Sequence, residues 1–147
     1  MATTRNGRVD DGPRLLHPGL IAAGAALLIG ALVTDIFYSQ TADMQWANFS
    51  VWLITAGLIL ALLAGIALVF DLVLGRAGAI SWVHLVALAG AALLSLLNVF
   101  IHSRDAWTSV VPQGLMLSVV VAVCLLLIGW RGWSVTAIRA SAADSAR

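Results

Sequence analysis

Four long stretches of the chain carry almost only apolar side chains, and polar residues collect between them. The stretches run from about residue 18 to 38, 49 to 74, 82 to 102 and 112 to 130, and Asp35 and Asp71 are their only formally charged members. In an α-helix that rises 1.5 Å per residue, about 20 residues cross the roughly 30 Å hydrocarbon core of a bilayer. The pattern therefore predicts four transmembrane helices.

The connections between these stretches are short, at about ten, seven and nine residues. Short connections join antiparallel neighbours in helix bundles. We therefore expect an all-α, integral membrane four-helix bundle of up-down-up-down topology over residues 17–133. Residues 1–16 and 134–147 are expected to form polar tails outside it.

Composition supports a membrane protein and narrows the function. Of the 147 residues, 61% are hydrophobic and 10% are charged, whereas soluble domains are roughly 45–50% apolar and about 25% charged. The single cysteine excludes an intrachain disulfide. There is no basic patch for nucleic acid, nucleotide-binding loop, zinc-protease motif or serine-nucleophile motif. The lipid bilayer is the one partner that composition itself indicates, and nothing in the motifs indicates an enzyme.

The distribution of arginine predicts the orientation of the bundle. All eight basic residues are arginines, and seven of them fall on the side of both termini. These seven are Arg5, Arg8, Arg14, Arg76, Arg131, Arg139 and Arg147, while Arg104 lies on the other side. Because cytoplasmic segments are enriched in Lys and Arg, we expect a multi-pass protein with both termini in the cytoplasm. The use of arginine without any lysine is associated with GC-rich bacterial genomes and favours a bacterial inner membrane.

Aromatic residues fall near the expected ends of the helices. Tyr38, Trp46, Trp52 and Trp107 are placed near the outer interface, and Trp82, Trp130 and Trp133 near the inner one. This distribution is typical of aromatic belts at the two membrane surfaces.

The polar residues within the stretches repeat at helical spacing. His17 and Asp35 are 18 residues apart, as are His84 and His102. Eighteen residues make five full turns, so each pair shares one helix face. Asp71 shares its face with the small residues Ala67, Ala64 and Gly57. Since polar groups at membrane depth face the bundle interior, three helices are expected to carry an inward polar face.

Antiparallel packing gathers these groups into two clusters. The predicted inner cluster contains His17, Asp71 and His84, and the predicted outer cluster contains Asp35, Asn98, His102 and Arg104. A buried carboxylate without a partner costs several kcal/mol. The simplest interpretation is therefore a set of hydrogen-bonded pairs that keep the helices in register: Asp71 with His84, and Asp35 with His102 or Arg104.

Three other interpretations of the clusters remain open. His17 and His84 on facing helices would suit the axial ligands of a b-type haem, with Gly24 and Gly90 making room for the macrocycle. The same two histidines with Asp71 would offer three ligands to a metal, without a usual spacing motif. A proton or small-ion relay would use both clusters but would have to cross an apolar middle.

The order of these motifs resembles a family of small bacterial membrane proteins known as domain of unknown function 2231. The resemblance runs from about residue 17 to 133. It is carried by His17-Pro18, Ala31-Leu32-Val33-Thr34-Asp35-Ile36, Trp46 in the first connection, Asp71, Trp82, His84, Asn98 and Arg104. Some relatives look like membrane modules joined to iron–sulfur or cytochrome domains, and this implies a redox membrane partner and favours the haem interpretation.

Two departures from the family pattern weaken the idea of a shared cofactor site. Ile21-Ala22-Ala23-Gly24 stands where many relatives continue with a proline-containing, sometimes histidine-containing segment, and residues 67–70 lack a glycine often found before Asp71. The resulting hypothesis is a non-enzymatic membrane module, able to form homo-oligomers, whose His and Asp clusters set helix packing. The competing hypothesis is a haem-binding electron carrier that uses His17 and His84.

Overall fold

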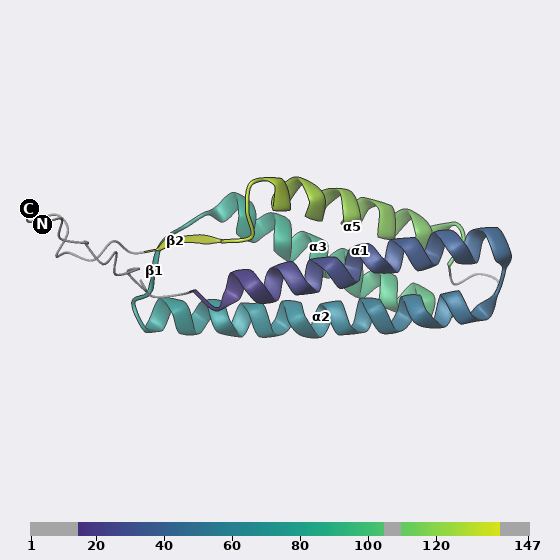
Figure 1. Ribbon diagram of the computed structural model, residues 1–147, viewed down its shortest axis with the longest axis horizontal. Helices are drawn as coiled ribbons and strands as arrows, with labels where there is room; N and C mark the ends of the chain where they lie inside the picture. The colour runs from purple at the N-terminus through teal and green to yellow at the C-terminus, as the bar shows by residue number, and fades with distance from the viewer. Residues whose placement is uncertain (1–14, 105–109, 139–147) are drawn as a thin grey trace, which may run out of the picture.

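Four long helices form the body of the molecule in a computed structural model, which describes residues 15–104 and 110–138 (Figure 1). They are α1 (His17–Thr41), α2 (Met44–Val73), α3 (Trp82–His102) and α5 (Gln113–Trp130). Each is long and apolar enough to cross a membrane. The predicted all-α bundle of four candidate transmembrane helices is confirmed.

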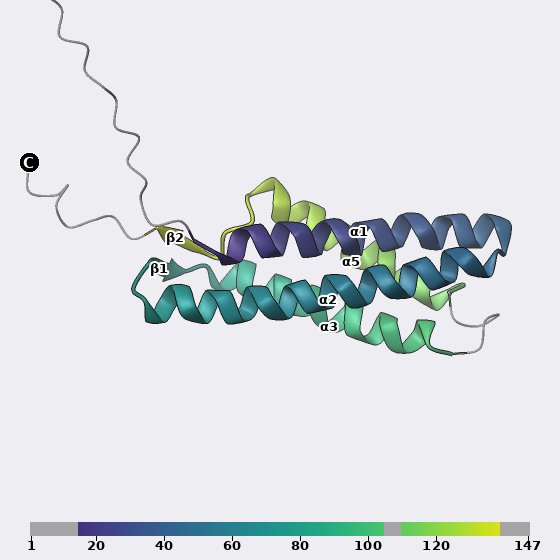
Figure 2. The ribbon, with the colours of Figure 1, turned by 60° about the horizontal axis from the view of Figure 1, so that its bottom comes forward.

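The helices are arranged as an antiparallel bundle in which each packs mainly against two neighbours. α1 packs most extensively on α2 and also contacts α5, while α3 contacts α5 and α2. Figure 2 shows α1 and α2 side by side along the length of the bundle. We call the end where α1 begins and α5 finishes the terminal end, and the end where α1 turns into α2 the hairpin end.

The turn between α1 and α2 is much tighter than the sequence predicted, because only Ala42 and Asp43 separate the two helices. Ala42 adopts a left-handed backbone conformation with φ 53°, and the Asp43 side chain accepts a hydrogen bond from the Gln45 amide at 2.9 Å. Asp43 is therefore an N-cap, and α2 begins before its apolar stretch does. The expected ten-residue connection is wrong, and Trp46 lies within a helix.

A short two-stranded ribbon closes the terminal end. β1 (Ala77–Ile80) lies between α2 and α3, and β2 (Thr136–Ile138) follows α5. The strands are antiparallel, with Ala77 opposite Ile138 and Ile80 opposite Thr136. The predicted tail from 134 onward is therefore wrong for residues 136–138, while residues 1–14 and 139–147 lie outside the described residues.

Small residues allow the closest helix contact, between α1 and α2. A Cβ added to Gly57 would stand 2.8 Å from Cγ of Leu28, and one added to Gly24 would stand 3.2 Å from the carbonyl oxygen of Gly57. The space beside Gly24 is therefore occupied by atoms of α2. The apolar core at mid-bundle consists of Ala25, Leu28, Ala31, Ile54, Ala91, Val121 and Leu125.

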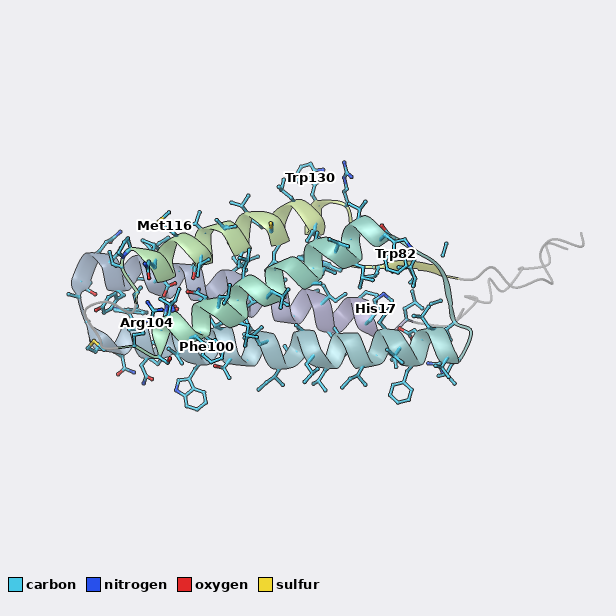
Figure 3. The ribbon with its side chains drawn as sticks, turned by 180° about the vertical axis from the view of Figure 1, so that it is seen from behind. His17, Trp82, Phe100, Arg104, Met116 and Trp130 are labelled. Atoms are coloured by element: carbon cyan, nitrogen blue, oxygen red, sulfur yellow. The ribbon has the colours of Figure 1, made fainter. Side chains whose placement is uncertain are left out.

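The tryptophans divide into exposed and packed groups. Trp52, Trp82 and Trp130 are well exposed, as lipid-facing side chains would be, and Figure 3 shows Trp130 projecting away from the bundle. Trp46 instead stacks on Phe37 with ring centroids 4.7 Å apart, and Trp133 covers Gly129. The belt interpretation is thus too simple for these two residues. Trp107 lies outside the described residues.

Candidate functional site

A buried carboxylate joins all four helices near the hairpin end. Asp35 of α1 has no exposed surface. Its Oδ1 atom is 2.9 Å from Nε2 of His102 on α3 and also accepts a hydrogen bond from the Ser50 hydroxyl on α2. Its Oδ2 atom accepts from the Ser118 hydroxyl on α5 at 2.5 Å. One side chain therefore contacts a polar side chain on every other helix of the bundle.

Asn98 extends this network along α3. Its side-chain amide donates to the Ser118 hydroxyl at 2.8 Å, and its backbone carbonyl accepts from Nδ1 of His102 at 3.0 Å. Within the described residues its own Oδ1 atom has no hydrogen-bond partner. We call Asp35, Ser50, Asn98, His102 and Ser118 together the Asp35 hub.

The helical spacing predicts Asp35, Asn98 and His102 in one cluster, as the structure has them, but gives no signal for Ser50 and Ser118. Ser50 faces Asp35 because the two residues are equidistant from the Ala42–Asp43 turn, and antiparallel helices align such positions. Ser118 is the polar residue that α5 presents to the bundle interior, where it is buried. The position of Ser50 could have been inferred had the start of α2 been predicted correctly.

Arg104 does not join the hub. It is exposed at the hairpin end and bonds Gln113 at 3.3 Å (Figure 3). Of the two partners that the sequence offered to Asp35, the structure pairs it with His102.

A second buried pair lies at the terminal end, where Figure 3 shows His17 between the helices. Oδ2 of Asp71 is 2.7 Å from Nδ1 of His17 and accepts the backbone amide of Leu16 at 3.1 Å. Nε2 of His17 accepts the backbone amide of Val135 at 3.2 Å. We call His17 and Asp71 the terminal pair. It connects α2 to the start of α1 and to the segment that leads into β2.

Asp71 also acts as the missing cap of α1. The first amides of a helix have no intrahelical acceptor, and α1 has no side-chain cap of its own. The carboxylate of Asp71 accepts the amides of Leu16 and, at 3.4 Å, His17. Negative charge is favoured at this position by the helix dipole. The Oδ1 atom of Asp71 has no hydrogen-bond partner among the described residues.

His84 lies apart from the terminal pair, so the predicted pairing of Asp71 with His84 is wrong. Nδ1 of His84 is 2.8 Å from the Ser81 hydroxyl, and the half-buried ring lines a separate hollow beside Arg131. The physical reason is that the uncapped start of α1 lies at the level of Asp71. The amides of Leu16 and His17 and the His17 ring all bond Oδ2 of Asp71, while His84 bonds Ser81 at the start of its own helix.

The geometry bears on the cofactor hypotheses at His17. Both ring nitrogens of His17 are hydrogen-bonded, so an iron atom there would have to displace Asp71 or the Val135 amide. The space at Gly24 is filled by α2. Over residues 15–104 and 110–138, no group of three His, Cys, Asp or Glu side chains is arranged to hold a metal ion.

The two polar sites are separated by the apolar core. Ser95 lies between them on α3, and its hydroxyl bonds the carbonyl of Ala91 in its own helix at 2.8 Å. Leu28, Ile54, Val121 and Leu125 belong to the apolar core that lies between the two sites. The described side chains therefore form two separate polar sites, one toward each end of the bundle.

Comparison with known proteins identifies the family. A family model described as "Predicted membrane protein (DUF2231)" matches residues 13–141. The chain belongs to this family. The four apolar helices of this DUF2231 protein agree with the description, and the resemblance noted in the sequence is confirmed. No curated protein and no solved structure matches the chain.

Proposed function

We propose that this chain is a non-enzymatic membrane module in which two buried His–Asp pairs set the packing of four transmembrane helices. The observation that carries the proposal is the position of Asp35, whose carboxylate contacts side chains of α2, α3 and α5. A group that binds three helices at one level fixes their register as well as their proximity.

The physics of membranes favours such a role. Lipid tails are as apolar as the helix surfaces, so burial of apolar side chains contributes little free energy to helix association. Close packing of small residues and interhelical hydrogen bonds supply the attraction instead. The Gly24–Gly57 contact supplies the first between α1 and α2, and the Asp35 hub supplies the second among all four helices.

The bonding of Asp35 and His17 supports a structural role over a catalytic one, although Oδ1 of Asp71 and Oδ1 of Asn98 have no partner among the described residues. Asp35 accepts hydrogen bonds on both carboxylate oxygens, and His17 uses both ring nitrogens within the fold. A catalytic group normally keeps an atom within reach of substrate, whereas these groups are directed at one another.

The test of the proposal compares the stability and the colour of the purified protein. Asp35→Ala is expected to lower the free energy of unfolding in detergent while the protein remains colourless when isolated from haem-replete cells. A haem absorption band that disappears in His17→Ala or His84→Ala would overturn the non-enzymatic module and support electron transfer. Ion flux in liposomes that is lost in Asp35→Asn or Asp71→Asn would overturn it in favour of transport.

We further propose that the terminal end faces the cytoplasm in a bacterial inner membrane. The support is the arginine distribution, with Arg76 and Arg131 at the terminal end and Arg104 at the hairpin end. Topology reporters fused after Arg76 and after Asp105 should report cytoplasmic and external locations respectively. The reverse result would overturn the orientation and leave the packing role unaffected.

A further inference from the structure

The two ring nitrogens of His102 both face oxygen acceptors. Nδ1 is 3.0 Å from the backbone carbonyl oxygen of Asn98, which can only accept a hydrogen bond. Nε2 is 2.9 Å from Oδ1 of Asp35. The first contact requires a hydrogen on Nδ1. The second requires another hydrogen between Nε2 and the carboxylate, because otherwise two lone pairs would face each other in a buried site.

A neutral imidazole beside an ionised carboxylate has one hydrogen too few for these two contacts. From this count we propose that the Asp35 hub is a proton-binding site that holds one proton shared by Asp35 and His102. The proton is placed either as imidazolium with carboxylate or as imidazole with carboxylic acid. Both placements give the pair a net charge of zero.

At the terminal pair, a neutral imidazole already supplies all the hydrogens that the contacts need. Nε2 of His17 faces the backbone amide of Val135, which can only donate, so this nitrogen carries a bare lone pair. The single ring hydrogen is then on Nδ1 and is donated to Asp71. A neutral histidine and an ionised carboxylate give this pair a net charge of −1.

Burial and local dipoles agree with this difference in charge. Asp35 lies well inside α1, where an uncompensated buried charge would be costly, and a shared proton removes that charge. Asp71 instead contacts the first amides of α1, where the positive end of the helix dipole stabilises an anion. Each pair thus has the net charge that its surroundings tolerate.

The hub lies beside a hollow at the hairpin end, and we infer that proton exchange takes place on this side. The hollow has a volume of about 400 Å³. It is lined by Met44, Gln45, Ala47, Asn48, Val51, His102 and Arg104. The amides of Gln45 and Asn48 and the guanidinium of Arg104 are groups that water can solvate. We therefore assign proton entry to this end, through His102.

Other ionisable and charged groups lie on the elements around the hub. On α1, Tyr38 is buried one turn beyond Asp35, and at the hairpin end Asp43 and Arg104 are exposed. α5 contributes no charged side chain, and its Cys124 lies toward the other end of the bundle.

The proposed proton goes beyond the packing role, since the hub could join the helices in either charge state. The test is ¹⁵N NMR of the full chain with labelled histidine in a lipid bilayer at neutral pH, combined with infrared detection of carboxylic acid. We expect His102 to show two protonated nitrogens, or one together with a carboxylic acid band that is absent in Asp35→Asn. His17 should show one protonated and one bare nitrogen.

Substitutions assign the signals and control the result. His84→Gln should remove its own resonances and leave the other two histidines unchanged, while Asp35→Asn should return His102 to one protonated nitrogen without altering His17. A bare nitrogen on His102 without an Asp35 carboxylic acid band would overturn the proposal, as would two protonated nitrogens on His17. If Asp35→Asn fails to fold, His17→Gln identifies the His102 resonances by removing those of His17, and Asp35→Glu, which keeps a carboxyl group, assigns the carboxylic acid band by shifting it. The outcome of these spectra is independent of unfolding measurements, which test the packing role.

Discussion

Asp35 stands seven residues before Ala42, Ser50 stands seven residues after Asp43, and their side chains are hydrogen-bonded across the hairpin. The tight turn therefore sets which polar groups of α1 and α2 meet. α3 and α5 add His102 and Ser118 at the same level. From these contacts follow expectations that separate a packing role from an incidental cluster.

Replacing Asp35 by alanine should destabilise the whole bundle. The change leaves His102, Ser50 and Ser118 without their common acceptor, and removal of one partner of a buried charged pair costs about 3–5 kcal/mol. Thermal or denaturant unfolding in detergent, followed by circular dichroism, measures the loss. Asp35→Asn keeps one acceptor oxygen and should lose less. An alanine variant as stable as the parent would rule out the hub as a packing device.

The two serines of the hub should contribute smaller amounts that depend on Asp35. Interhelical hydrogen bonds in membrane proteins contribute about 0.6 kcal/mol on average, so Ser50→Ala and Ser118→Ala should each lower the unfolding free energy by about that amount. Ser103→Ala is the matched control, because the hydroxyl of this exposed serine bonds the Phe100 carbonyl of α3, and among the described residues it has no bond to another helix. In an Asp35→Ala background the effects of the two hub substitutions should shrink, and undiminished effects would show that Asp35 is not their partner.

The contact between α1 and α2 should be sensitive to a single methyl group. A Cβ at position 57 would press on Leu28 at 2.8 Å, so Gly57→Ala should cost about 1–3 kcal/mol through overpacking. Gly65 lies on the same helix and has nothing within 4 Å of its added Cβ, so Gly65→Ala is the control and should be neutral or slightly stabilising. Equal losses in unfolding free energy for the two variants would contradict the close approach seen here.

The terminal pair should protect a specific backbone amide. His17→Ala removes the acceptor of the Val135 amide, and hydrogen exchange at that amide should become faster. Mass spectrometry of the peptide that contains Val135 measures the exchange rate. His84→Ala is the control, because the ring of His84 bonds Ser81 and should leave this peptide unchanged. Faster exchange in both variants would indicate general loosening of the terminal end.

Length and hydropathy were sufficient to predict the four helices, because a bilayer requires about 20 apolar residues per crossing. The helical repeat also placed Asp35 and His102 among the inward-facing residues, and the structure joins them. The length of a helix and the face that a polar residue occupies are both set within a single helix. Apolar run length and helical periodicity are therefore enough to predict them.

What the sequence could not predict depends on backbone groups and on distant pairing. The partner of Asp71 is decided by the uncapped start of α1, whose amides carry no side-chain signature. The ribbon joins residues 77–80 to 136–138, two short segments without an alternating pattern. Ser50 reaches Asp35 through the α1–α2 hairpin and Ser118 reaches it through the packing of α5 on α1, and neither hydroxyl has a sequence signal of its own.

The amide of Val135 connects the last part of the described chain to the first helix, since it bonds His17 just before β2 pairs with β1. The segment after α5 therefore holds the terminal end together by two contacts, one to α1 and one to β1. A tag or partner domain that replaced the chain after Trp130 would remove both contacts and leave Nε2 of His17 without its donor. A fusion made after Ile138 would keep both contacts, so that position is the better junction for an attached domain.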